Sequence, residues 1–272
     1  MTMRQSIPSR RMPALFIGHG SPLNAVEKNP FTESWACLGR CIGKARGVLV
    51  ISAHWLTDGT EVTAMEQPRT VHDFSQQFPQ LMDFRYRASG STILAGRVRE
   101  LLAPVPVKYS QNWGLDQGAW TVLNHFYPQA DVPVVQLSID IRQPPAWHYE
   151  LGKKLQRLRS EGILIIGSGN LVYNPVMADY LREEFAYRWA EDFQERVAGL
   201  ILSGRDEALL DIEALGDDHG LAVPSPDHYL PLLYSLATRN RDDDAVEFIT
   251  PQCVYGSVSM MSMALWPSAN PD

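Results

Sequence analysis

The chain has 272 residues, 45% of them hydrophobic, and a formal net charge of -7. This composition can bury one substantial core, so we expect a single domain over residues 1–272, with a flexible start at 1–11 and a flexible tail at 267–272. The negative charge and the lack of any Lys/Arg run argue against nucleic-acid partners, and no apolar run reaches the roughly 20 residues that cross a membrane.

The cysteines indicate the cellular compartment. Cys37, Cys41 and Cys253 are odd in number and include no CxxC pair, which argues for a reducing environment. The apolar stretch before Gly18 is too short for the core of a signal peptide, so we predict a cytoplasmic protein. Cys37 and Cys41 are spaced by one helical turn and would suit a soft metal, but without a second pair the sequence favours buried thiols.

Short apolar runs alternate with helical patterns along the chain. Strands are predicted at Ala14–Ile17, Val48–Ser52, Val105–Tyr109, Val132–Ser138, Ile163–Ile166 and Ala245–Thr250. Helices are predicted at Ser91–Leu102, Ala146–Arg159 and Ala178–Leu202. This alternation is typical of an α/β domain with a mostly parallel central sheet flanked by helices. Ligands of such sheets bind at the carboxyl ends of the strands.

Two histidines directly follow predicted buried strands. His19 lies between two glycines, whose missing Cβ atoms let the backbone come close to a ligand, and His54 precedes Trp55. Neutral imidazole is the commonest protein ligand for iron, zinc and copper. Two histidines at equivalent strand ends therefore predict a metal site, the alternatives being a turn histidine and a histidine at the edge of the core.

The other histidines give weaker signals. His228 lies in a proline-rich segment where Pro226, at a helix start, would hold it rigidly, although this pattern alone does not assign it. His72 precedes Asp73 and could help to bind a polar ring, or only pack. Three histidines in helical patterns or a loop are predicted to be structural: His125, His148 and His219.

Seven motifs are spread over about residues 12 to 265. They are Gly18-His19-Gly20-Ser21-Pro22, Ser52-Ala53-His54-Trp55, Val71-His72-Asp73-Phe74, Leu115-Asp116-Gln117-Gly118-Ala119-Trp120, Gln136-Leu137-Ser138-Ile139-Asp140, Gly167-Ser168-Gly169-Asn170 and Pro226-Asp227-His228-Tyr229-Leu230-Pro231-Leu232-Leu233-Tyr234. In sequence and order they resemble the 4,5-DOPA extradiol dioxygenase-like family, which belongs to the class III extradiol, or protocatechuate 4,5-dioxygenase-type, enzymes.

The resemblance implies a metal-dependent ring-cleaving enzyme. His19, His54 and His228 match the family's metal ligands, for Fe(II) in the active form or Zn(II) as purified. A catechol-type aromatic such as DOPA and O2 are the implied reactants, which the metal brings into contact. We expect a monomer or homodimer.

Two positions depart from the family pattern. Gln117 and Tyr173 stand where the family usually has the histidines that surround the substrate and move protons. Glutamine cannot carry a proton, and tyrosine, with an ordinary pKa of about 10, is an acid but a poor base. Losing general acid–base help typically costs roughly 10²–10⁴ in rate. We predict that Tyr173, Gln117 and His72 surround the substrate of a re-tuned dioxygenase.

Two other functions fit the same residues. One is a zinc hydrolase, in which the metal activates water and no oxygen is consumed. The other is a catalytically silent metal-binding protein on the same scaffold. The re-tuned dioxygenase is favoured because the three predicted ligands and the motifs around them are intact.

Overall fold

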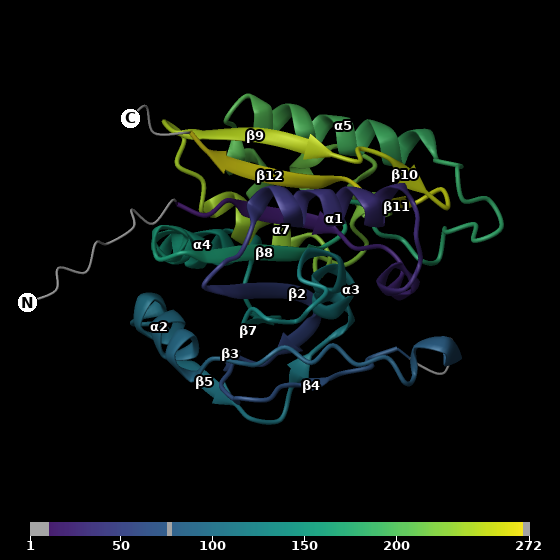
Figure 1. Ribbon diagram of the computed structural model, residues 1–272. Coiled ribbons are helices and arrows are strands. Elements are labelled where there is room, and N and C mark those ends of the chain that lie inside the picture. Colours follow the sequence, from purple (N-terminus) through teal and green to yellow (C-terminus); the bar gives the residue numbers. More distant parts are fainter. Residues whose placement is uncertain (1–10, 75–77, 269–272) are drawn as a thin grey trace, which may run out of the picture.

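An eight-stranded sheet runs through the centre of the computed structural model, which describes residues 11–74 and 78–268. The strands lie in the order β5-β3-β7-β2-β8-β1-β12-β9 (Figure 1). Their bounds are β1 Ala14–Gly18, β2 Gly47–Thr57, β3 Thr60–Thr63, β5 Val107–Ser110, β7 Val134–Asp140, β8 Ile163–Gly169, β9 Asp244–Ile249 and β12 Ser262–Pro267. Of the two predicted flexible ends, residues 1–10 and 269–272 lie outside the described residues.

The four central strands β7, β2, β8 and β1 are mutually parallel, while β12 and β9 extend the sheet in antiparallel fashion on one side and β3 does so on the other. This arrangement confirms the predicted α/β fold with a mostly parallel sheet. Gly18 pairs with Gly169, and Ser52 pairs with Ser168. The carboxyl ends of β1, β8 and β2 therefore meet at one edge of the sheet.

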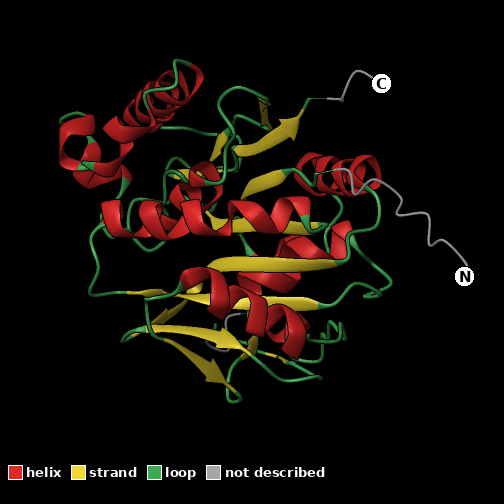
Figure 2. Cartoon of the chain, turned by 90° about the vertical axis from the view of Figure 1, so that its left-hand side faces the viewer, coloured by secondary structure: helices red, strands yellow, loops and turns green. Residues whose placement is uncertain are grey.

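Helices cover both faces of the sheet (Figures 1 and 2). Their bounds are α1 Pro30–Ile42, α2 Thr92–Leu102, α3 Gln117–Phe126, α4 Pro145–Ser160, α5 Arg188–Leu202 and α7 Leu230–Ala237. Alternate residues of β2 enter two separate cores: Leu49 and Ile51 pack with α2, α4, α5 and α7, whereas Val48 and Val50 pack with α1 and α3. In the described part of the chain, no helix is long and apolar enough to span a membrane.

The helix predicted over 178–202 begins only at Arg188, so the first part of that prediction was wrong. Residues before Arg188 form turns whose backbone bonds to a hairpin formed by β10 (Cys253–Val254) and β11 (Val258–Ser259); the N–H of Asp179, for example, donates to the carbonyl of Tyr255 at 2.8 Å. Because these turns satisfy backbone groups without burying an apolar stripe, tertiary pairing overrides helix propensity here.

The prediction of buried thiols in α1 was also wrong, because Cys37 and Cys41 are exposed. The helix buries Trp35 and Leu38 against the sheet, and positions one turn apart on its other side face solvent.

Candidate functional site

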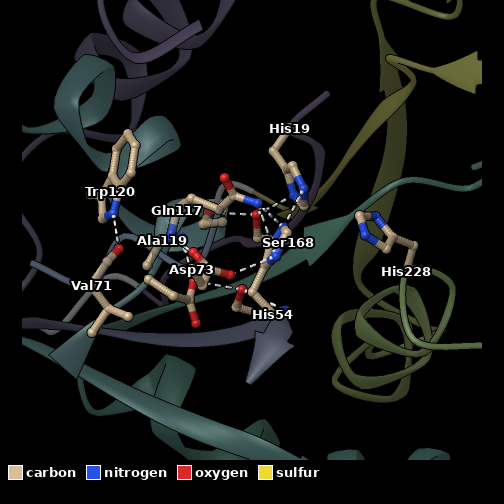
Figure 3. A network of polar contacts seen from close by, with 12 residues as sticks. His19, His54, Val71, Asp73, Gln117, Ala119, Trp120, Ser168 and His228 are labelled. Carbon is tan, nitrogen blue, oxygen red and sulfur yellow. Dashed lines mark hydrogen bonds and ion pairs between the residues drawn. The ribbon is translucent and has the colours of Figure 1, made fainter. Parts of the chain in front are cut away.

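Three imidazoles converge at the carboxyl edge of the central strands (Figure 3). His19 directly follows β1, His54 lies in the last part of β2 within a shift in strand register, and His228 lies two residues before α7. Nε2 of His19 and Nε2 of His54 are 3.1 Å apart. One ring nitrogen from each of the three residues lies within 4.8 Å of the others. The structure thus brings together the three predicted metal ligands.

The orientation of His19 follows from its contact with Ser168. The Ser168 hydroxyl donates its proton to the carbonyl of Gly118 at 2.6 Å, and Nδ1 of His19 lies 3.0 Å from the same oxygen. Since the hydroxyl proton is already committed, Oγ can only accept from Nδ1–H. His19 is therefore the tautomer whose Nε2 lone pair is free and directed toward the other two histidines.

Asn170 holds His228 in the same way. Its side-chain N–H donates to the carbonyl of Ser259 at 2.8 Å, which leaves Oδ1 to accept from Nδ1 of His228 at 3.2 Å. The backbone N–H of Asn170 also donates to the His228 carbonyl at 3.0 Å. This close approach requires Gly169, because a Cβ there would overlap that carbonyl.

A carboxylate holds His54. Nδ1 of His54 lies 2.8 Å from Oδ2 of Asp73, and each side chain is 15% exposed. Burial alone would lower the pKa of His54, but the hydrogen bond and charge of Asp73, together with the charges of Asp116 and Asp227, raise it above its ordinary value. A carboxylate on Nδ1 also makes the opposite nitrogen a more basic ligand.

This donor set fits a transition-metal ion. Burial first, and the nearby His54 second, lower the pKa of His19 well below its ordinary value; burial and the other two histidines do the same for His228. Both rings are neutral at pH 7, as a ligand must be, and a cation that binds would release whatever proton the metal-facing nitrogen of His54 carries. Ligand nitrogens about 2.0–2.1 Å from an ion lie about 3–4 Å apart, close to the spacing found here. Three imidazoles suit Fe(II) and Zn(II) alike.

A cavity of about 770 Å³ opens beside the histidines. Its wall includes His19 and His54, the amide of Gln117, and several aromatic side chains. The aromatic residues are Phe74, Phe78, Tyr173, Tyr180 and Tyr255. No Lys, Arg, Asp or Glu is among its lining residues in the described part of the chain. This volume accommodates a substituted aromatic ring.

Gln117 is fixed at the cavity by the start of α3. Asp116, fully buried, caps this helix by accepting from the N–H of Ala119 at 3.1 Å, and its carboxylate also accepts from Ser52 and Gln136 at 2.7 Å each. The Gln117 side-chain nitrogen then lies 3.0 and 3.1 Å from the two ring nitrogens of His54. Its carbonyl oxygen is buried and has no hydrogen-bond partner among the described residues, while the residue itself lines the cavity.

Tyr173 covers His228 on the cavity side. The two rings stack with centroids 3.8 Å apart and planes 13° from parallel. Burial, followed by the proximity of Tyr180 and the charge of Asp227, raises the pKa of Tyr173 to about 12. Tyr173 therefore keeps its proton at neutral pH and can donate a hydrogen bond, whereas a phenolate is disfavoured.

Over residues 15–265 the chain matches the family described as the catalytic LigB subunit of aromatic ring-opening dioxygenase. The chain belongs to this family. It is 46% identical over 261 residues to a 4,5-DOPA dioxygenase extradiol of Escherichia coli (strain K12), covering 94% of this chain and 96% of that one. It is 34% identical over 242 residues to a 4,5-DOPA dioxygenase extradiol of Beta vulgaris, covering 85% and 88%.

A solved structure agrees with this assignment. The crystal structure of an uncharacterized protein from Escherichia coli K12 matches with a TM-score of 0.83 and 41% sequence identity, covering 94% of this chain and all of that one. The predicted resemblance to the 4,5-DOPA extradiol dioxygenase-like family is thus confirmed.

The remaining predicted residues of this LigB-family chain occupy different places. His72 is not among the described residues that line the cavity. Its ring packs against those of Phe74, a wall residue, and Trp120, with centroid distances of 5.6 and 5.8 Å. Pro226 forms a turn in which its carbonyl accepts from the Tyr229 N–H at 2.9 Å, whereas α7 begins later, at Leu230. The predicted helix start at Pro226 was therefore wrong, although His228 does lie within the turn that Pro226 begins.

Sequence reasoning missed the groups that orient the ligands. Ser168 and Asn170 were noted only as parts of a motif, yet each bonds a metal-facing histidine. One available signal was their position, since they end a strand adjacent to the strand that precedes His19. Tyr180 and Tyr255 carried no signal of this kind, because they reach the cavity from turns and a hairpin.

Proposed function

We propose that this chain is an Fe(II)-dependent extradiol dioxygenase that opens the ring of a catechol-type aromatic such as DOPA. The observation that carries the proposal is the convergence of three oriented imidazoles at one side of an aromatic-lined cavity of about 770 Å³. Such a cavity admits a planar ring and gives its hydroxyl groups access to His19 and His54. Family membership and the names of the relatives support the same reaction.

His19, His54 and His228 would hold the metal, with Ser168, Asp73 and Asn170 fixing their rings. When bound, Fe(II) supplies the redox chemistry that allows O2 to react with a catechol beside it. The protein's own contribution is to keep the metal-facing nitrogens of His19 and His228 unprotonated and to hold the substrate hydroxyls within reach.

Gln117 and Tyr173 define the re-tuned part of the proposal. The Gln117 amide, which lines the cavity beside His54, forms a hydrogen bond with a substrate hydroxyl and thereby orients the ring. The Tyr173 hydroxyl, protonated because its pKa is about 12, donates to an oxygen that gains negative charge during ring opening. Neither side chain acts as a base at pH 7, which distinguishes this site from one with histidines at these positions.

The role of His72 stays a prediction. Its contact with the wall residue Phe74, at a ring-centroid distance of 5.6 Å, supports an indirect effect on the substrate. We propose that His72 is a positioning residue that keeps the Phe74 ring against the cavity.

Oxygen uptake tests the proposed function. The protein is loaded anaerobically with Fe(II) or Zn(II), air is admitted, and oxygen and absorbance are followed with L-DOPA, caffeate and protocatechuate. A Gln117→His/Tyr173→His double variant is measured alongside. We expect the natural chain to consume oxygen and form a ring-opened product with Fe(II) only.

Three other outcomes contradict the proposal in different ways. Activity only in the double variant means that the metal site is intact but the natural chain has left this chemistry. Turnover of an ester or amide by the Zn(II) form without air supports a hydrolase. Bound metal with no turnover in any form supports a silent metal-binding protein.

The three free cysteines support a cytoplasmic location. A monomer or homodimer is proposed because two-fold dimers are the commonest oligomers of soluble proteins.

A further inference from the structure

Three tyrosines form one side of the cavity. Tyr173 stacks on His228, while Tyr180 and Tyr255 come from the turns before α5 and from the β10–β11 hairpin. The rings of Tyr180 and Tyr255 lie 5.5 Å apart with planes at 44°. Tyr180 is 63% exposed and so stands at the mouth of the cavity. All three rings line the cavity, and an aromatic face carries negative π-electron density.

The charges around these tyrosines are negative. Burial first, and then the charges of Glu183 and Glu27, raise the pKa of Tyr255. Asp227 acts on Tyr173 in the same direction. The cavity wall itself contributes no carboxylate and no Lys or Arg among the described lining residues. A ligand in the cavity therefore meets an uncharged aromatic wall on which the surrounding carboxylates act electrostatically.

Two cationic side chains close in sequence to the cavity-lining residues are engaged elsewhere. The Lys28 ammonium forms an ion pair with Glu33 at 3.4 Å. The Arg182 guanidinium lies over the ring of Phe185, 3.9 Å from its centroid. Neither cation is among the described residues that line the cavity, so neither is placed to neutralise an anionic substituent inside it.

We infer that the tyrosine wall selects catechols whose side chain ends in an ammonium group over catechols whose side chain ends in a carboxylate. This inference rests on the proposed function, because it assigns the part of the substrate remote from the diol. With the diol at His19 and His54, the side chain extends toward Tyr173, Tyr180 and Tyr255. An ammonium there lies over aromatic faces and near acidic groups, whereas a carboxylate meets the same groups with unfavourable charge.

The expected preference is moderate. A cation over an aromatic face gains about two- to thirtyfold in affinity, depending on how far the site excludes water. Since Tyr180 is largely exposed, we expect it alone to contribute about two- to fivefold. The contribution of the exposed carboxylates should weaken at high salt, where their charges are screened over a few ångströms.

Binding of phenols that cannot be cleaved tests the inference separately from catalysis. The full-length protein as purified is titrated under nitrogen, by calorimetry, with tyramine, 4-ethylphenol and 3-(4-hydroxyphenyl)propionate. These share one ring and a two-carbon spacer and differ in the charge at its end. We expect tyramine to bind at least about fivefold more tightly than the propionate, with 4-ethylphenol between them.

The variants Tyr180→Leu and Tyr180→Phe identify the origin of the preference. Leucine removes the aromatic face and should lower the ratio of tyramine to propionate affinity by about two- to fivefold, whereas phenylalanine keeps the face and the ratio. Equal affinities, a preference for the propionate, or an unchanged ratio in Tyr180→Leu would overturn the inference.

Oxygen uptake by the Fe(II) form with dopamine, 4-ethylcatechol and 3-(3,4-dihydroxyphenyl)propionate completes the test. Ring opening of all three at equal kcat/KM would overturn the inference while leaving the proposed function intact. If the phenols bind in the expected order of affinity but no catechol is turned over, the inference stands and the proposed function is overturned.

Discussion

Replacing Ser168 with alanine should weaken metal binding without removing a ligand. Ser168 is fully buried, and its hydroxyl makes two contacts: it donates to the Gly118 carbonyl at 2.6 Å and accepts from Nδ1 of His19 at 3.0 Å. Without that acceptor, the His19 ring is free to rotate and to place a proton on Nε2, the nitrogen that faces the metal. Loss of such a partner typically lowers metal affinity by about 10–100-fold, or about 1.4–2.8 kcal/mol.

The same change also has a structural cost, which needs a matched control. Losing the hydroxyl leaves a buried carbonyl without its donor, at about 1–3 kcal/mol of unfolding free energy. Ser235→Ala provides the control, because Ser235 is equally buried, donates to the Leu15 carbonyl at 2.6 Å and accepts from a backbone N–H at 3.0 Å. It contacts no metal-facing histidine in the described residues.

The assay is the dissociation constant for Zn(II) or Co(II), measured by competition with a chelator, alongside chemical denaturation of the metal-free protein. Both variants should be destabilised, but only Ser168→Ala should bind metal about 10–100-fold more weakly. If the two variants keep equal metal affinity, the hydroxyl does not orient His19 and the reasoning about its tautomer is refuted.

Three further substitutions test other parts of the molecule. Tyr173→Phe retains the ring that stacks on His228 and loses only the hydroxyl, so kcat for ring opening should fall by about 10²–10⁴ with metal affinity unchanged; an unaltered kcat would exclude Tyr173 as a proton donor. His72→Ala should raise the KM for a catechol and leave kcat unchanged in steady-state kinetics, and a fall in kcat alone would instead assign it to the chemistry. Asp244→Asn breaks a fully buried ion pair in which Oδ2 of Asp244 lies 2.5 Å from a guanidinium nitrogen of Arg159. The change should cost about 3–5 kcal/mol of unfolding free energy at pH 7. Burial alone would raise the pKa of Asp244. Hydrogen bonds from Arg159 and from the backbone outweigh this effect of burial and lower the pKa below its ordinary value. The stability advantage of the natural residue should therefore be complete above about pH 4 and disappear as the pH falls through that lowered pKa, and denaturation curves in which the gap widens in acid would contradict this.

Local patterns predicted the elements that carry the site. The apolar runs before His19 and His54 do form buried parallel strands at whose carboxyl edge both residues lie, although β2 runs on past the predicted end at Ser52 to Thr57 and so includes His54. This works because strand formation, burial on both faces and the meeting of parallel carboxyl ends are all properties of short segments and their order. The helix predicted from residue 178 failed for the opposite reason, since several backbone partners of those turns lie about 70 residues away in the β10–β11 hairpin.

The sequence by itself determined the fold class, the family and the three histidines, because each of these depends on motifs that are contiguous along the chain. Only the tertiary structure decided how the histidines are held and what surrounds the substrate. The partner of His19 is 149 residues away and the partner of His228 is 58 residues away. The tyrosine wall likewise assembles from a loop, a turn and a hairpin. Side-chain direction at such places depends on packing between distant segments, which no local periodicity records.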